Sequence, residues 1–320
     1  MKFLKNIDEF FTSHYFSCSP FLLALSGGPD SMALFQCLVL FLKNNPFRYK
    51  FHIAHVDHGW RPESSEEASI LQNLSNIHSI PFHLKRLNPD HLEGNLEAAF
   101  RSERYNFFKE ICSNHHLSGV MTAHHQGDQA ETILKRVLEG SYWTNLSGLQ
   151  PVTHMEGLEI FRPFLQITKK EILDFLIEHN INYFNDSTNN DVQFLRARMR
   201  HQILPWLNES FGKDVNSALL HLGSEMRELS SHLDEQLQPF LLKCKKVDKA
   251  IHIELTEKMP HSYIVKALIR KLCEECHFIP SRQILAQATE ALIKGDTHKK
   301  FLMGNNVINI NRKHISINLK

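Results

Sequence analysis

The sequence predicts an α/β protein: a doubly wound parallel sheet joined to a smaller, mainly helical C-terminal domain. Short apolar runs alternate with helical patterns over the first part of the chain, an order typical of βαβ units with helices on both faces of the sheet. The length of 320 residues allows two domains, at roughly 150 residues each. After Gly212 the alternation gives way to a mostly helical pattern.

The N-terminal domain, residues 1–212, is predicted to hold the sheet. Its expected strands are short apolar runs: Phe21–Leu25, Phe51–Val56, Pro81–Leu87, Gly119–Ala123 and Leu158–Phe161. Its expected helices show helical periodicity or a capping signal: Ser31–Leu42, Leu96–His115, Asp128–Leu138 and Thr168–His179. In the last helix, Thr168 and Glu171 have the spacing of a capping box.

The C-terminal domain, residues 213–320, is predicted to be helical as far as Leu292, with breaks at Pro239, Pro260 and Pro280. Apolar and polar residues then alternate over Val307–Leu319, which predicts a terminal β-hairpin.

Composition places the chain among ordinary globular proteins, with 42% hydrophobic and 22% charged residues. No apolar run reaches the roughly 18 residues that predict a membrane span, so we expect no membrane partner. Asp8 and Glu9 interrupt the N-terminal region, which argues against a signal peptide, and the six cysteines are scattered; a cytoplasmic protein with free thiols is expected. Because the net charge is only +1, binding of nucleic acid would require local clusters of Lys and Arg.

The most specific local signal is a loop between the first expected strand and helix. It consists of Ser26, Gly27, Gly28, Pro29, Asp30 and Ser31. The glycines permit a backbone that aims N–H groups at an anion, and the following helix adds its N-terminal donors. The serines add hydroxyl donors, and Asp30 is placed to hold Mg²⁺. No lysine follows as in the Walker pattern, which argues against transfer of the γ-phosphate. These six residues are predicted to bind ATP.

This string resembles the PP-loop of the N-type ATP pyrophosphatases, whose members adenylate a carbonyl oxygen and release pyrophosphate. Further stretches make the N-terminal two-thirds similar to the tRNA(Ile)-lysidine synthetase family: His55–Arg61, Arg101 with Arg104-Tyr105, Thr122–Thr132, and Asn185–Pro205 with its Asn185-Asp186-Ser187-Thr188-Asn189 string. The remainder matches only in size and character, so the chain looks like a short form with one C-terminal domain.

The resemblance implies an ATP-dependent ligase. It would join free L-lysine to the wobble cytidine in the CAU anticodon of tRNA(Ile), through an adenylated cytidine, giving lysidine, AMP and pyrophosphate. ATP and Mg²⁺ are the implied cofactors, the C-terminal domain is expected to bind the tRNA body, and a homodimer is compatible with the sequence. The lysine amine, with a solution pKa of about 10.4, must lose a proton before it attacks, so a carboxylate is expected nearby as base or anchor.

Asp30, Asp128 and Arg101 are the predicted catalytic residues. Both carboxylates follow expected strands, and the carboxyl ends of neighbouring parallel strands meet in one crevice. Arg101 and Arg104 share a helix face and are predicted to contact phosphate or the tRNA backbone; a solvated pair is the alternative. Four histidines, His55, His58, His124 and His125, lack the matching Cys or carboxylate spacing of a metal site and are expected to form hydrogen bonds near the nucleotide; His55 and His125 are predicted to bind ATP.

Arg196, Arg198 and Arg200 are predicted to bind tRNA. Arg196 and Arg200 lie four residues apart, with Arg198 turned away, so one helix would present arginine both to the ATP site and to RNA. A surface helix with salt bridges is the alternative.

The chain departs from the family pattern at Gly127, where the family usually has the first of two aspartates, and also at Trp60 (usually Leu) and Ala197 (usually Asn). We expect Asp128 to carry the needed charge alone, with Gly127 leaving room for water or Mg²⁺. Cys273 and Cys276 have metal-ligand spacing, but no second pair completes a zinc site; they are expected in a helical core.

Two alternatives remain open from the sequence. A PP-loop tRNA base thiolase would need reactive cysteines near the loop, where the chain has only the unpaired Cys18, Cys37 and Cys112; Cys37 and Cys112 are expected to be buried. A catalytically dead tRNA-binding protein is favoured only by Gly127.

Overall fold

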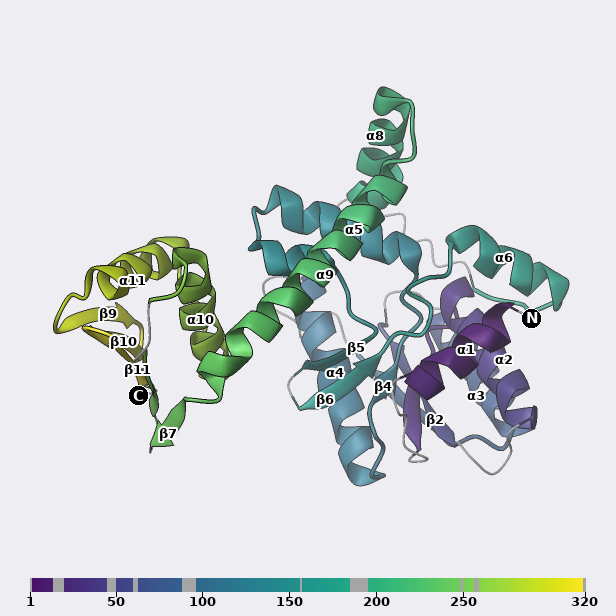
Figure 1. Ribbon diagram of the computed structural model, residues 1–320. Helices are drawn as coiled ribbons and strands as arrows, with labels where there is room; N and C mark the ends of the chain where they lie inside the picture. Colours follow the sequence, from purple (N-terminus) through teal and green to yellow (C-terminus); the bar gives the residue numbers. More distant parts are fainter. Residues whose placement is uncertain are drawn as a thin grey trace. The chain divides into compact units, whose positions relative to one another are not determined.

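The structure is a computed structural model that describes residues 2–13, 20–44, 50–59, 63–87, 96–155, 157–184, 195–247, 250–255 and 259–318. The chain forms two compact units, Met1–Glu225 and Met226–Lys320, coloured along the sequence in Figure 1. Within the described ranges, no helix has both the length and the apolar character needed to cross a membrane.

The N-terminal unit contains a six-stranded sheet in the order β3-β2-β1-β4-β6-β5. Its strands are β1 (Phe21–Ala24), β2 (Phe51–Asp57), β3 (Phe82–Arg86), β4 (Val120–Met121), β5 (Val152–Met155) and β6 (Leu158–Phe161). All neighbours pair in parallel except β5, which pairs antiparallel with β6 at the sheet edge. The predicted parallel α/β sheet is confirmed, and β5 is an addition that the sequence did not reveal.

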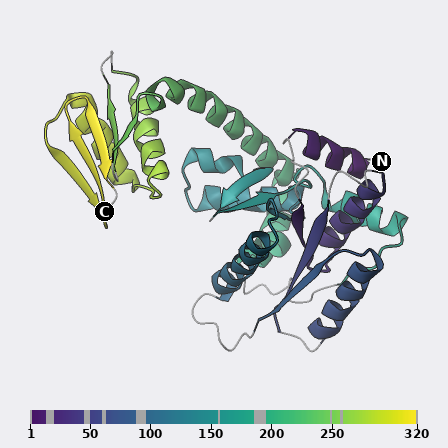
Figure 2. The same cartoon turned by 90° about the horizontal axis from the view of Figure 1, so that it is seen from below.

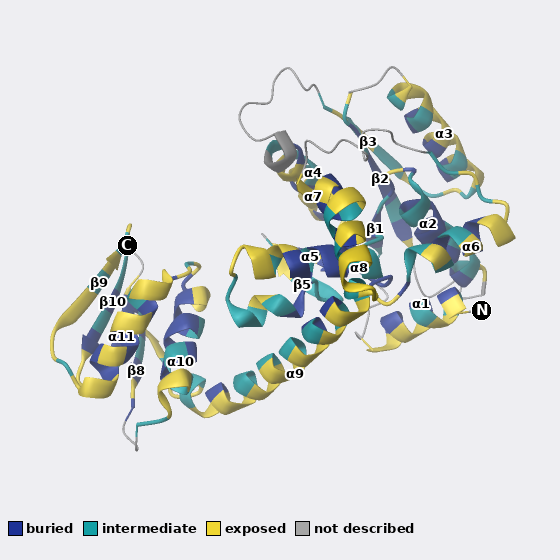
Figure 3. Cartoon of the chain, turned by 90° about the horizontal axis from the view of Figure 1, so that it is seen from above, coloured by how far each residue is buried: buried dark blue, intermediate teal, exposed yellow. Residues whose placement is uncertain are grey.

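Helices cover both faces of this sheet, as Figures 1 and 2 show. The helices around the sheet are α1 (Lys2–Ser13), α2 (Pro29–Asn44), α3 (Ser64–Ile77), α4 (Leu96–Asn114) and α6 (Lys169–Glu178). Alternate residues of β1 face opposite ways. Phe21 and Leu23 pack in the core shared by α1, α2 and α6, whereas Leu22 packs with Tyr105 and Phe108 of α4. Figure 3 shows buried residues concentrated on the strands and exposed ones on the outer side of α3. Because both faces are covered, the sheet is doubly wound.

A second helical layer completes the unit. It comprises α5 (Gln126–Leu138), the short η2 (Trp143–Ser147), α7 (Leu195–Arg198), the π-helical η4 (Met199–Ile203), α8 (Leu204–Phe211) and the start of α9 (Val215–Leu241). Leu219 of α9 packs in one apolar cluster with Ile133 of α5. The compact unit therefore continues past Gly212, near which we placed the domain boundary, to Glu225.

The C-terminal unit holds more strand than predicted. A five-stranded antiparallel sheet runs in the order β7-β8-β11-β10-β9. Its strands are β7 (Lys245–Val247), β8 (Ala250–Glu254), β9 (Lys299–Met303), β10 (Asn306–Asn311) and β11 (His314–Asn318). The predicted hairpin is confirmed as β10 and β11. The other three strands, with three to five residues each, were not predicted.

Two helices complete this unit, α10 (Ser262–Glu275) and α11 (Arg282–Lys294). They pack in one core with isoleucines of β8, β10 and β11. The helix that we expected to break at Pro239 continues to Leu241. Cys273 and Cys276 are only 0% and 2% exposed and belong to this core, which confirms their predicted packing.

Candidate active site

The carboxyl ends of β1, β2 and β4 open onto a cavity of about 240 Å³. Among its lining residues are several that the sequence singled out: Ser26, Asp30, Ser31, Arg101, Arg104, Asp128 and Arg196. These residues come from stretches far apart in the chain. The topology therefore confirms that the phosphate loop and the second carboxylate meet in one crevice, as expected for an open α/β sheet.

The backbone of the phosphate loop requires glycine at its first turn. Gly27 has φ +84°, a region that residues with a side chain rarely adopt. A Cβ atom there would lie 2.4 Å from the ring of Phe184, whose N–H donates to the Gly27 carbonyl at 2.9 Å. The segment after α6 therefore packs directly against the loop, and no residue larger than glycine fits at position 27.

Ser31 organises the same loop from within. Its hydroxyl accepts the Gly27 N–H at 3.1 Å, donates to the Gly28 carbonyl at 3.0 Å and lies 3.1 Å from the Ser26 hydroxyl. Ser31 is buried, whereas Ser26 is exposed. Since α2 begins at Pro29, its N-terminal dipole adds to an anion site at this position.

Asp30 forms an ion pair that the sequence did not reveal. The Lys169 ammonium lies 2.6 Å from Asp30 Oδ1. Lys169 is the first residue of α6, immediately after Thr168, whose capping box with Glu171 is confirmed. The phosphate loop therefore has a lysine beside it after all, supplied by a helix 139 residues further along the chain. The capping signal and the strand before it were the only hints to its position.

His125 joins the two predicted catalytic carboxylates. It is the N-cap of α5, and its Nδ1 accepts the Gly127 N–H at 2.9 Å. In the neutral ring the proton must then be on Nε2, which lies 3.9 Å from Asp30 Oδ1 and 3.7 Å from Asp128 Oδ2. His125 is 4% exposed and is not among the described residues that line the cavity. The hydrogen bond from His125 to Asp128 comes from its backbone N–H, the ring caps α5, and the expected nucleotide contact stays a prediction.

Asp128 belongs to a four-residue ion-pair cluster that we call the clamp: Asp128, Glu131, Arg196 and Arg200. Arg196 NH2 and Arg200 NH2 donate to Asp128 Oδ1 at 2.5 and 2.8 Å. Their Nε atoms donate to Glu131 at 3.0 and 2.6 Å. Both carboxylates are buried, at 6% and 5% exposure. Glu131 had not been singled out from the sequence.

The clamp saturates the Asp128 carboxylate. Its second oxygen, Oδ2, accepts the backbone N–H of His125 at 2.8 Å. Burial alone would raise the pKa of Asp128, but His125 and Arg196 outweigh it and hold the pKa well below its usual range. Asp128 is therefore a fixed negative charge and a poor proton acceptor.

A π-helical turn accompanies the two arginines of the clamp. Pro205 has no N–H to donate to the preceding turn, and η4 lies directly before α8. The side chains of Arg196 and Arg200 both reach the carboxylates, while Arg198 is exposed on another side. The salt-bridged alternative is thus what the structure shows for Arg196 and Arg200; their contact with tRNA stays a prediction, as does that of Arg198.

His124 lines the cavity directly. Its Nδ1 lies 2.8 Å from the Thr122 hydroxyl. Burial lowers the pKa of His124 to about 3 despite the attraction of Asp128, and Arg196 adds to the lowering. The ring is neutral at physiological pH and is suited to hydrogen bonding rather than to proton transfer. The sequence predicts a hydrogen bond near the nucleotide for both His124 and His125, and only His124 is in the described lining of the cavity.

Four residues of α4 line one wall of the cavity: Arg101, Arg104, Tyr105 and Phe108. The Arg101 guanidinium lies 4.8 Å from the centre of the Tyr105 ring, a cation–π geometry that orients a cation without neutralising it. Both arginines line the cavity, so they share a helix face as predicted; their contact with phosphate or the tRNA backbone stays a prediction.

His55 lies elsewhere. It is 5% exposed, its Nδ1–H donates to the Leu25 carbonyl at 2.8 Å, and burial lowers its pKa. Ala54 and Val56 on either side of it line the cavity, whereas His55 is not in the described lining. Because side chains alternate along a strand, His55 faces away, and the structure gives it a structural bond in place of the expected ATP contact. Trp60, Arg61 and the 185–189 string are outside the described residues.

The space beside Gly127 is not open. A Cβ atom there would meet His125 Cε1 at 2.7 Å and Nδ1 at 3.1 Å. Our expectation that Gly127 leaves room for water or Mg²⁺ is wrong, because the His125 ring fills that position. In this chain, the His125 ring occupies the space that a side chain at position 127 would need.

A phosphate loop and a charged cavity at the carboxyl edge of a parallel sheet define a nucleotide-binding α/β enzyme, and the PP-loop domain model matches residues 1–207. The chain belongs to the tRNA(Ile)-lysidine synthase family. It is 41% identical over 315 residues to that synthase of Protochlamydia amoebophila (98% of this chain, 68% of the relative). It is also 37% identical to that of Chlamydia felis (91% and 90%) and 36% identical to that of Chlamydia trachomatis serovar D (95% and 94%).

A solved structure shares the fold. The U34-tRNA thiolase NcsA from Methanococcus maripaludis matches with a TM-score of 0.56 and 14% identity, over 71% of this chain and 79% of that one. A thiolase activity is not favoured here. Cys37 and Cys112 are buried, as expected, and burial raises both thiol pKa values, that of Cys112 to about 12, so neither is a ready nucleophile.

Proposed function

We propose that this ATP-dependent ligase adenylates the wobble cytidine in the CAU anticodon of tRNA(Ile) and joins L-lysine to it, giving lysidine, AMP and pyrophosphate. The observation that carries the proposal is one cavity holding the phosphate loop, Asp30, Asp128 and Arg101, in a member of the lysidine synthase family. The cytosine carbonyl oxygen attacks the α-phosphate and pyrophosphate leaves. The lysine amine then attacks the ring carbon, and AMP departs with that oxygen.

The loop and Lys169 are suited to the triphosphate. Ser26, the start of α2 and the Lys169 ammonium offer hydroxyl, N–H and cationic donors within one region. Pyrophosphate is a multiply charged leaving group, and fixed donors stabilise the charge that develops on it. Lys169 thus supplies the cation that a Walker-type loop carries within its own sequence.

The two aspartates have different roles in this proposal. Asp128 is saturated by two arginines and a backbone N–H, so it holds Arg196 at the cavity rather than accepting a proton. Asp30 is 27% exposed at its side chain and lines the cavity. Asp30 is therefore the carboxylate that anchors the incoming lysine amine or a Mg²⁺ ion.

The residues at the loop fit Mg²⁺. A carboxylate and a hydroxyl, from Asp30 and Ser26, are hard oxygen donors of the kind this ion prefers. Bound there with ATP, the ion would neutralise phosphate charge. Since Lys169 already contacts Oδ1 of Asp30, we propose Oδ2 as the ligand.

The tRNA is proposed to approach over the arginines that border the cavity. Arg104 lines it from α4, and exposed Arg198 extends the basic surface beyond the clamp. The C-terminal unit is proposed to bind the tRNA body, with exposed Lys245, Lys246, Lys299 and Lys300 as phosphate contacts. Such contacts weaken with salt as counterions are released.

The test is incorporation of labelled lysine into tRNA. Transcripts with CAU and GAU anticodons on the same tRNA(Ile) body are incubated with ATP and the enzyme. We expect label only in the CAU transcript, and only with ATP present. Equal labelling of both, or none in either, would contradict the proposed substrate.

A further inference from the structure

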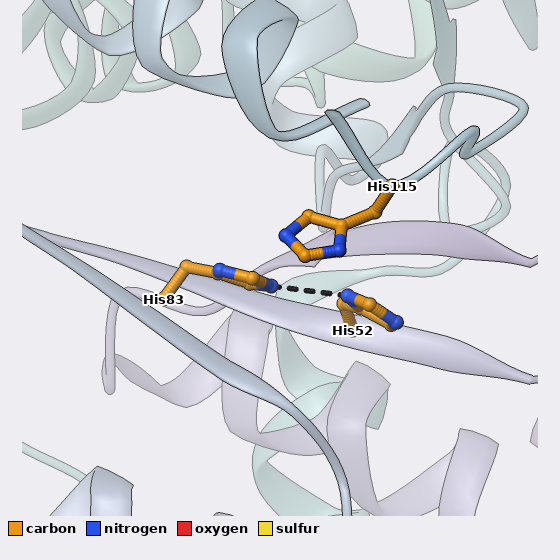
Figure 4. A group of neighbouring side chains, drawn as sticks. All are labelled: His52, His83 and His115. Carbon is orange, nitrogen blue, oxygen red and sulfur yellow. Dashed lines mark hydrogen bonds between the residues drawn. The ribbon is translucent and has the colours of Figure 1, made fainter. Parts of the chain in front are cut away.

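Of the residues that the structure describes, three histidines from separate elements gather at one place: His52, His83 and His115 (Figure 4). His52 is on β2, His83 on the edge strand β3, and His115 directly follows α4. One ring nitrogen from each lies within 4.8 Å of the others. The predicted reaction uses none of them.

The three rings lie in close contact. His52 Nδ1 and His83 Nε2 are 3.0 Å apart, and these two rings stack with centroids 5.2 Å apart. The His115 ring lies 5.1 Å from His52 and 4.8 Å from His83, centroid to centroid. In tetrahedral zinc sites with Zn–N bonds near 2.0–2.1 Å, ligand nitrogens are about 3.4 Å apart. A small rotation of the exposed His115 side chain would close the remaining gap.

We propose that His52, His83 and His115 bind a late first-row divalent cation, with Zn²⁺ the best match, and that the ion clips edge strand β3 and the end of α4 to β2. Imidazole is a preferred ligand of Zn²⁺. Three protein nitrogens with one position left to water form a common zinc coordination set.

This site is separate from the ATP cavity. His52 precedes Ala54 on the same face of β2, towards the amino end of the strand, whereas Ala54 and Val56 line the cavity near the carboxyl end. Arg101 and His115 are separated by about 20 Å along α4 at 1.5 Å per residue. The ion is therefore expected to stabilise the unit without taking part in adenylation.

The experiment titrates Zn²⁺ into chelator-treated, full-length protein without ATP, by calorimetry, and repeats the titration with Co²⁺, whose visible absorption reports tetrahedral nitrogen ligands. We expect one equivalent to bind. At 100-fold excess over Kd, the melting temperature should rise by roughly 5–10 °C. His115→Asn, on an exposed side chain, should weaken binding at least tenfold without lowering the metal-free melting temperature.

Two control variants keep the test specific. His154→Asn removes an exposed histidine on β5, and His221→Asn removes the partner of Glu225 in a pair with chelating i,i+4 spacing; both should bind Zn²⁺ like the unmodified chain. Absence of binding, or binding that His115→Asn leaves unchanged, would overturn the site. Loss of binding in His221→Asn alone would assign the ion to the α9 pair and overturn it equally.

Discussion

Lys169 and Asp30 form an ion pair with Nζ and Oδ1 only 2.6 Å apart, although 139 residues separate them in the sequence. The pair joins the start of α6 to the phosphate loop. It gives the loop a cation beside its helix N-terminus, bound to a carboxylate that lines the cavity.

Lys169→Met should lower kcat/KM for ATP by about 10- to 100-fold, because hydrogen bonds to charged groups contribute about 1.5–3 kcal/mol. Lys170→Met is the matched control, since its side chain is the exposed neighbour on the same helix, and it should leave the constants unchanged. Equal effects of the two substitutions would show that Lys169 has no special role at the loop.

Arg196→Met should destabilise the N-terminal unit, while Arg198→Met should not. Removing Arg196 leaves the buried Asp128 and Glu131 with one cation between them, and we expect a loss of about 2 kcal/mol, below the 3–5 kcal/mol of a fully buried pair because Arg196 is half-exposed. Thermal melting measures this loss. Arg198→Met should instead weaken tRNA binding and reduce its salt dependence. A stable Arg196→Met protein would show that the clamp is not structural.

Gly127→Ala and Gly127→Asp should both slow single-turnover lysidine formation by about tenfold, the equivalent of about 1.4 kcal/mol. The reason is space: either Cβ would meet the His125 ring at 2.7 Å and displace the α5 cap. A rate in Gly127→Asp equal to or above that of the unmodified chain would contradict this account. If Gly127→Ala left the rate unchanged and Gly127→Asp lowered it, the effect would be due to the added charge and not to the space that the Cβ atom needs.

The lowered pKa of His124 predicts that the stability of the folded chain depends on pH. Its pKa is lowered to about 3 in the folded chain, against about 6.5 when unfolded. The unfolded state therefore binds the extra proton first, and stability falls as pH drops below 6.5. Between pH 7 and pH 5, protonation of His124 in the unfolded state should lower the free energy of unfolding by about 2 kcal/mol. His124→Asn should remove that part of the loss, as measured by urea unfolding at both pH values. Parallel losses in both proteins would refute the assignment.

Local signals were sufficient for much of the fold. The loop at Gly27, the strands with their apolar runs and the Thr168 capping box each depend on neighbouring residues, so the sequence predicts them. Helix α3 was missed because Ala68 and Leu71 are its only buried apolar residues among those described, a weak periodic signal. Strands β7, β8 and β9 were also missed; β7 and β9 have no buried residue that would mark a core-facing side.

The unpredicted parts of the site depend on packing between distant segments. Lys169 reaches Asp30 because α6 packs on α2, and Glu131 joins Asp128 only when the helix carrying Arg196 closes over α5. The His55 side chain points away from the cavity because side chains alternate along β2. The motif around His55 did not show which face of the strand this side chain would occupy. Spacing along the chain predicted that Arg196 and Arg200 share a face, but not that buried carboxylates occupy it.

The most direct test of the account uses ATP labelled at its α-phosphate and measures which product carries the label. With CAU-anticodon tRNA(Ile) and no lysine, the unmodified chain should transfer AMP label to the tRNA and release pyrophosphate; adding lysine should convert the label to free AMP. Asp30→Asn should reduce the rate at least 100-fold, about 3 kcal/mol of transition-state stabilisation, while Asp174→Asn on exposed α6 surface should not. Formation of ADP and phosphate, or turnover of Asp30→Asn within threefold of the unmodified chain, would contradict adenylation at this cavity.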